Sequence, residues 1–124
     1  MYRSLIVALL VLSGYASAHE WTPTYPVMQQ SHVQGVYYTD MELFNGREDI
    51  RYYDISVWDE QWGRIPFAAE IRLVPLDYLQ RRKIRIYIQE QYLEKPFYIC
   101  SLSKIEAEGE MKSAVSSRIC SKVK

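Results

Sequence analysis

The sequence lacks the motifs of the common catalytic and nucleotide-binding sites. It contains no G-x-S-x-G, no P-loop, no G-x-G-x-x-G and no H-E-x-x-H. It has only two histidines and two cysteines, and the cysteines have no clustered histidine or carboxylate neighbours, so a zinc site is excluded. We therefore expect a protein that is not an enzyme.

An excess of charge of either sign is also missing. Fifteen lysines and arginines balance fifteen aspartates and glutamates, which gives a formal net charge of zero. A general nucleic-acid binder needs a strongly basic face, and a membrane-surface anchor needs a polybasic run. We therefore expect no nucleic-acid partner and a mixed, solvated surface.

Long hydrophobic runs are absent except for one at the start of the chain. The basic residue Arg3 precedes the apolar run Leu5–Leu12, and the small residues Ala16-Ser17-Ala18 follow it. This is the pattern of a cleaved secretory signal peptide over residues 1–18. The run is too short to span a bilayer comfortably, so we expect no membrane anchor after cleavage. The sequence predicts a secreted or periplasmic protein whose single domain covers 19–124.

Clear helical periodicity is missing as well, whereas Tyr, Ile and Val are frequent and favour strands. The segment 19–34 is expected to be irregular, since Pro23 and Pro26 exclude a central strand there. Seven short strands are expected after it, at 36–44, 50–58, 65–67, 71–76, 83–89, 97–102 and 114–123. Short strands separated by turns every eight to twelve residues predict an all-β, immunoglobulin-like antiparallel β-sandwich, with a small barrel as the alternative.

Cys100 and Cys120 are the only cysteines, and an exported protein meets an oxidising environment. If the last two strands form a hairpin around Gly109, residue numbers that sum to about 220 face each other, which places Cys100 opposite Cys120. We therefore predict a disulfide between them. A bridge that closes a loop of about 20 residues stabilises by roughly 3 kcal/mol in the chain-entropy model.

Histidine stands at the predicted mature N-terminus. After cleavage, the α-amine and the imidazole of His19 can chelate one copper ion, and His32 can supply a second imidazole. The alternative is that His19 is an ordinary residue at a frayed terminus and His32 a surface residue of a loop. A copper-binding protein is therefore the second function hypothesis.

Three groups of side chains admit both a binding and a structural interpretation. Asp40 and Glu42 share a strand face and form either an acid–base pair of carboxylates or a solvated face, and we favour the solvated face. The basic cluster at 81–85 either receives an anion or discourages edge pairing. The aromatic residues either pack the core or form a sugar- or partner-binding platform; they are Trp21, Trp58, Trp62, Tyr37, Tyr38, Tyr52 and Tyr53. Of these, we expect Trp62 to be exposed, since it precedes Gly63 in a polar turn.

From residue 36 to 123, the order of strand types resembles the N-terminal immunoglobulin-like domain of periplasmic pilus chaperones. The resemblance rests on Glu-Leu-Phe-Asn-Gly at 42–46, Tyr-Asp-Ile-Ser-Val-Trp at 53–58, Arg-Lys-Ile-Arg-Ile-Tyr-Ile at 82–88 and Phe-Tyr-Ile-Cys at 97–100. Some members of that family join their last two strands by a disulfide, as Cys100 and Cys120 would. The family also has a second domain, which this sequence does not show.

The resemblance implies an exported assembly module that engages a protein partner in the cell envelope. The family holds a subunit's terminal carboxylate with an arginine of the first strand and a lysine near the last. Lys112 is the candidate for the lysine, and no arginine lies in 19–44. Val115, Ile119 and Val123 share one face of the last strand, so this strand either pairs with a partner's sheet by β-augmentation or fills its own core.

Overall fold

The computed structural model describes residues 19–104 and 116–124, and these form two antiparallel sheets without an α-helix. The first sheet contains β1 (His19–Thr22), β2 (Gln29–Gln30), β3 (Val36–Asn45), β5 (Ala68–Ala69) and β7 (Arg81–Gln89). The second contains β4 (Tyr52–Asp59), β6 (Leu73–Pro75), β8 (Phe97–Lys104) and β9 (Arg118–Val123). A short 3₁₀ turn, η1 (Glu90–Tyr92), follows β7. The predicted signal peptide lies outside the described residues.

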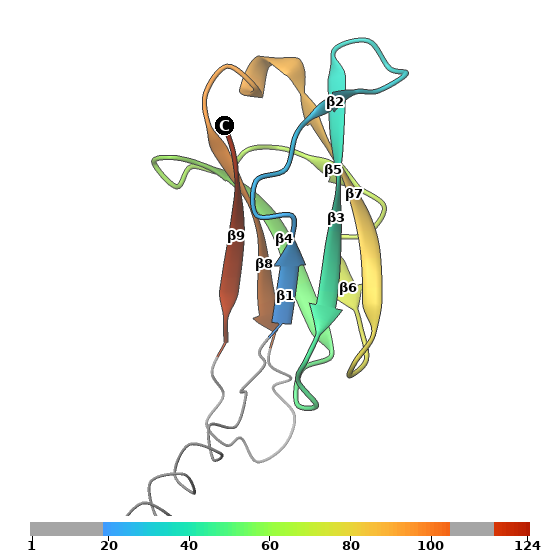
Figure 1. Cartoon of the computed structure of the whole chain (residues 1–124). Coiled ribbons are helices and arrows are strands. Elements are labelled where there is room, and N and C mark those ends of the chain that lie inside the picture. The colour runs from blue at the N-terminus through green and yellow to red at the C-terminus, as the bar shows by residue number, and fades with distance from the viewer. Residues whose placement is uncertain (1–18, 105–115) are drawn as a thin grey trace, which may run out of the picture.

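The two sheets pack face to face as a β-sandwich (Figure 1). The strand order is β1-β3-β7-β5 in the first sheet, with β2 also on β3, and β6-β4-β8-β9 in the second. No strand ladder joins the two sheets among the described residues. The structure thus confirms the immunoglobulin-like sandwich and decides against the barrel.

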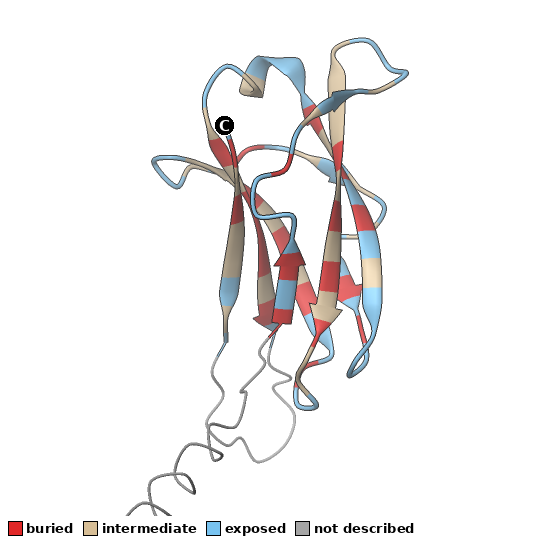
Figure 2. Cartoon of the chain, viewed as in Figure 1, coloured by how far each residue is buried: buried red, intermediate tan, exposed pale blue. Residues whose placement is uncertain are grey.

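Period-two alternation of apolar residues builds the core between the sheets. In β7 the three isoleucines Ile84, Ile86 and Ile88 point inward and are at most 3% exposed, as the sequence predicts. In β4 the inward residues are Tyr53, Ile55 and Val57. Figure 2 shows buried residues alternating with exposed or partly buried ones along these strands.

The segment 19–34 was expected to be irregular, and this is wrong for two short stretches that pair with β3. Residues His19–Thr22 form β1, which pairs with the end of β3, and Gln29–Gln30 form β2 at its beginning. In β1, His19 and Trp21 point inward and Glu20 and Thr22 outward. Four alternating residues are too short a pattern to stand out in a sequence, and Pro23 lies just beyond the strand's end.

The segment after β3 crosses from one sheet to the other, because β3 pairs with β1, β2 and β7 but not with β4. Asn45, the last residue of β3, is fully buried at this crossing. Its side-chain amide donates to the carbonyl oxygens of Ile50 (2.7 Å) and Leu76 (2.9 Å), and its Oδ1 accepts from the Tyr53 hydroxyl (2.5 Å) and the Arg47 N–H (2.9 Å). This one side chain therefore joins three segments of the chain.

The predicted disulfide is present between Cys100 on β8 and Cys120 on β9. The two residues face each other across the ladder, and the pairs of this hairpin all sum to 220. The last strand was predicted over 114–123, whereas β9 begins at Arg118, and Ala114 and Val115 lie outside the described residues.

Candidate functional site

The strand β9 is an edge of the second sheet, and its outer side offers backbone hydrogen-bonding groups. The Cα atoms of Cys100 and Cys120 are 4.0 Å apart, as in the narrow, non-hydrogen-bonded pairs of an antiparallel ladder. The N–H and C=O of Cys120 therefore point away from β8, and by alternation so do those of Arg118 and Lys122. These are the groups that an added strand would use.

One of these outward groups is already used within the domain. The N–H of Lys122 donates to the carbonyl oxygen of Thr24 at 3.1 Å, which confirms the direction of the alternation. Beside it, the Lys124 ammonium lies 4.7 Å from the centre of the Tyr25 ring. Among the described residues, no hydrogen bond reaches the outward groups of Arg118 and Cys120. The backbone groups of the edge that bond to no described residue are therefore those of Arg118 and Cys120, while β1 lies close to β9.

The inward face of β9 packs less completely than that of its neighbour β8. Val123 is buried, Ile119 is only partly buried against the core, and Ser121 lies between them. The Ser121 hydroxyl is buried without a hydrogen-bond partner among the described residues. On the opposite face of the sheet, the disulfide joins β9 covalently to β8.

The residues predicted to bind a partner are thus placed as follows. Ile119 and Val123 face the domain's own core, which is the structural interpretation offered for them. Lys112 and Val115 lie outside the described residues. The sequence predicts the last strand as the candidate edge, and among the described residues β9 pairs with β8 alone; which backbone groups point outward follows only from the register.

The side chain of His19 lies between the sheets and is 5% exposed. Its Nε2 is 3.0 Å from the hydroxyl of Ser101 on β8, and its Nδ1 is 3.1 Å from that of Ser117, which immediately precedes β9. Its ring packs on Tyr53 at a centroid distance of 4.8 Å. Burial lowers the pKa of His19, and the charge of Arg47 adds to this effect. The histidine therefore connects β1 to the beginning of the β9 edge in its neutral form.

The structure does not bring the two histidines together. His19 pairs with Asn45 at the end of β3, whereas His32 lies in the loop before Val36 at its beginning. The nine steps from Val36 to Asn45, at about 3.3 Å each, separate these ends by about 30 Å. No cluster of three or more potential metal ligands occurs among the described residues. Copper binding stays the alternative hypothesis. We expect no cofactor and no tight site in a copper titration, and a single tightly bound ion lost in both His19→Ala and His32→Ala would reverse this expectation.

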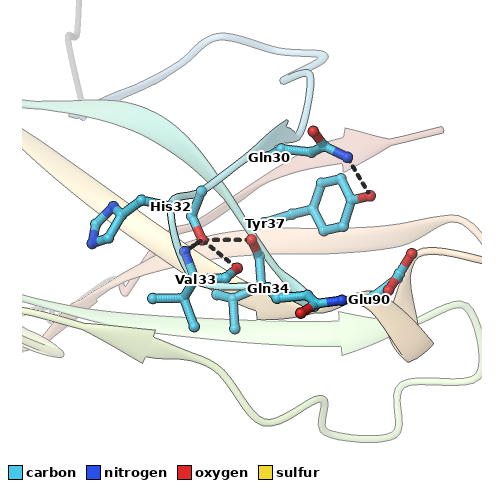
Figure 3. Close-up of a pocket in the computed structure, with 9 residues that line it drawn as sticks. Gln30, His32, Val33, Gln34, Tyr37 and Glu90 are labelled. Carbon is cyan, nitrogen blue, oxygen red and sulfur yellow. Dashed lines mark hydrogen bonds between the residues drawn. The ribbon is translucent and has the colours of Figure 1, made fainter.

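His32 lines a polar pocket of about 410 Å³ formed by 30–37 and Glu90 (Figure 3). The Ser31 hydroxyl shapes this loop by bonding to the carbonyl oxygens of Val33 (3.0 Å) and Val36 (2.6 Å). Gly35 adopts a left-handed conformation with φ of 79°. In Figure 3, His32 and Glu90 lie on opposite sides of the pocket, so they do not act as a pair there.

The charged residues of the first sheet neutralise one another across strands. Asp40 forms two hydrogen bonds with the Arg85 guanidinium, at 2.7 and 3.1 Å, and these lower the pKa of its carboxyl group. Glu42 pairs with Arg81 at 3.2 Å. The carboxylates are therefore ion-pair partners on a strand face, and two residues of the basic cluster are already occupied.

The seven candidate aromatic residues do not form one platform. Tyr37 and Tyr38 lie on β3 of the first sheet and Tyr52 begins β4, and the other four divide between the core and the outer face of the second sheet. Trp21 and Tyr53 belong to the core, and the Trp21 indole N–H donates to the Ile99 carbonyl oxygen across the sandwich at 3.0 Å. Trp58 and Trp62 lie instead on the outer face of the second sheet, where Tyr98 stacks against Trp62 at 5.3 Å. Trp62 is 54% exposed, as predicted. Tyr98 is not among the predicted aromatic residues, although the alternation of β8 places it on the outward face.

No protein-family model and no curated protein sequence matches the chain. Solved structures do match it. It superposes on the E. coli chaperone DraB with a TM-score of 0.69 at 17% identity, covering 86% of this chain and 53% of that one. It superposes on a chain of the Salmonella enterica SafA pilin–SafB chaperone complex with a TM-score of 0.67 at 11% identity, covering 90% and 55%.

The chain thus spans about half the length of the chains that it matches. No helix among the described residues is long and apolar enough to cross a membrane. At these identities the likeness concerns the fold, and it confirms the resemblance on which the sequence analysis relied. The chain has the immunoglobulin-like β-sandwich fold found in pilus-chaperone structures.

Proposed function

We propose that the protein is an exported, non-enzymatic binding module that engages a protein partner in the cell envelope through the β9 edge. The observation that carries the proposal is the set of outward backbone groups of Arg118 and Cys120, on a strand that pairs on one side only within 19–104 and 116–124. A partner strand that binds there would gain main-chain hydrogen bonds, the usual source of affinity in β-augmentation.

The construction of the edge also supports this proposal. The disulfide and a ladder of six residue pairs keep β9 against β8, so the strand is held in place while its other side faces a partner. The fold's likeness to a structure of a pilin in complex with a chaperone is consistent with a protein as the partner.

The opposite edge of the same sheet provides a matched control. The strand β6 is short and contains Pro75, which cannot donate a hydrogen bond, and edge prolines oppose strand addition. Its residue Leu73 is 49% exposed. Ser116, just before β9, is also exposed.

Photo-crosslinking residues placed separately at Ser116 and Leu73 therefore test the edge in cell-envelope extracts. We expect a defined protein adduct from position 116 and none from position 73. Equal adducts from both positions, or none from 116 under gentle conditions, would remove the β9 edge as the binding site.

A further inference from the structure

The outer face of the second sheet carries an exposed aromatic surface beside cations that form no ion pair with any described residue. Trp62 stacks on Tyr98 with an interplanar angle of 14°, and Trp58 meets the edge of Trp62 at 6.5 Å. Because only one face of the Trp62 indole lies on Tyr98 and the side chain is 54% exposed, its other face is open to solvent.

The turn between 59 and 64 fixes this indole in place. The Asp59 Oδ1 accepts the N–H groups of Gln61 (2.9 Å) and Gly63 (2.7 Å), and the Trp62 N–H donates to the Asp59 carbonyl oxygen (3.1 Å). Trp62 itself adopts a left-handed conformation with φ of 61°. Glycine or asparagine adopts this conformation at lower cost, so a bulky residue here is a strained choice of the kind that gathers at functional sites.

Three cations surround the rings without carboxylate partners. Arg64 lies 4.8 Å and Arg118 5.5 Å from the Trp58 ring, and Lys122 lies 5.7 Å from the Tyr98 ring. None of the three forms an ion pair with a residue that the structure describes. The nearby Asp59 carboxylate instead accepts hydrogen bonds from the backbone of the 59–64 turn. On the first sheet, by contrast, Arg81 also lies over a ring, that of Phe44, but pairs with Glu42.

We propose that this aromatic–cationic surface binds an acidic oligosaccharide. A sugar ring would lie flat on the open face of Trp62, where its C–H bonds meet the negative π-face, and its carboxylate would face Arg64, Arg118 or Lys122. The carboxylates of the ligand would then neutralise the positive charges of these three side chains.

The surroundings favour a sugar over other anions. The strand β8 beneath the rings is paired on both sides, and the turn uses its own backbone groups, so a peptide finds no strand edge at Tyr98 or Trp62. Single-stranded nucleic acid requires a series of stacking rings along a basic groove, whereas Trp62 offers one open face in a chain of zero formal net charge.

Titration with hexagalacturonate, followed by tryptophan fluorescence and calorimetry, tests the proposal. We expect saturable binding to the folded protein at least ten-fold tighter than that of neutral maltohexaose. Trp62→Gly should lose binding at least ten-fold while keeping or raising the thermal midpoint, because glycine relieves the strained φ. Arg64→Gln and Arg118→Gln should each weaken binding three-fold or more, and Arg81→Gln should leave it unchanged.

Three results would overturn the proposal. One is the absence of preference for the acidic sugar, including no binding of either sugar. A second is equal or tighter binding of poly-glutamate or of a ten-nucleotide oligo-dT, which would assign the surface to acidic peptides or nucleic acid. The third is unchanged affinity in folded Trp62→Gly.

Discussion

Replacing Asn45 with alanine should destabilise the domain more than any exposed substitution does. The side chain is fully buried and makes four hydrogen bonds, two as a donor to carbonyl oxygens and two as an acceptor. A net contribution of about 1 kcal/mol for each bond gives roughly 4 kcal/mol. The carbonyl oxygens of Ile50 and Leu76 and the Tyr53 hydroxyl would lose a partner at the same time.

A double-mutant cycle pairs Asn45→Ala with Tyr53→Phe, which removes only the hydrogen bond between the Tyr53 hydroxyl and Asn45. Burial raises the pKa of Tyr53 to about 12, so its hydroxyl is protonated and donates to Asn45 at neutral pH. We expect a loss of about 1 kcal/mol, and in the double variant a coupling energy of similar size between the two positions.

Denaturant and thermal unfolding, followed by circular dichroism, measure these differences. For a domain of this size, 1 kcal/mol corresponds to about 4–8 °C, so Asn45→Ala should lower the midpoint by more than about 15 °C. Gln30→Ala removes an exposed amide with one long hydrogen bond of 3.5 Å and should change the midpoint little. An Asn45→Ala midpoint close to that of Gln30→Ala would refute the reasoning.

Three further predictions concern β9 and its neighbours. The double variant Cys100→Ala/Cys120→Ala should lose about 3 kcal/mol in denaturant unfolding, since it frees a closed loop with a sequence separation of 20; an unchanged midpoint would contradict this. Folding lowers the pKa of His19, so the neutral imidazole should contribute its full stabilisation above the unfolded pKa of about 6.5, and this contribution should decline as the pH falls below that value. His19→Gln should remove this part of the pH dependence of the free energy of unfolding. Ser121→Ala should raise the free energy of unfolding by about 1 kcal/mol because the buried hydroxyl has no hydrogen-bond partner among the described residues. Ser101→Ala, which removes a hydroxyl bonded to His19, is the control, and a similar gain there would contradict this reasoning.

The sequence predicts the sandwich and the β8–β9 register because each rests on a strong local pattern. The alternating isoleucines of β7 require one buried face, and the two cysteines fix which residues oppose each other in the last hairpin. Even so, the sequence does not give the partner of each strand. That β3 pairs with β7 and not with β4 depends on packing between segments that are far apart in the chain.

The candidate site is less predictable for two physical reasons. An edge is defined by a missing neighbour, and the backbone groups of Arg118 and Cys120 are the same in every residue type. The sequence places His19 at the predicted mature N-terminus, whereas the structure shows hydrogen bonds from its ring to Ser101 and Ser117, which follow it by 82 and 98 positions. Contacts at such separations leave no mark on a local pattern. Trp62, by contrast, was predicted to be exposed because its turn is determined locally by Asp59 and Gly63.

Amide hydrogen exchange, read by NMR in the presence and absence of the partner captured by crosslinking, tests the role of the β9 edge most directly. The N–H groups of Arg118 and Cys120 point outward and should exchange rapidly in the free domain. If a partner strand adds to β9, exchange at these two amides should slow by ten-fold or more, while that of Leu73 on the opposite edge should stay the same. Unchanged exchange at Arg118 and Cys120 with the partner bound, or protection confined to β6, would contradict the account.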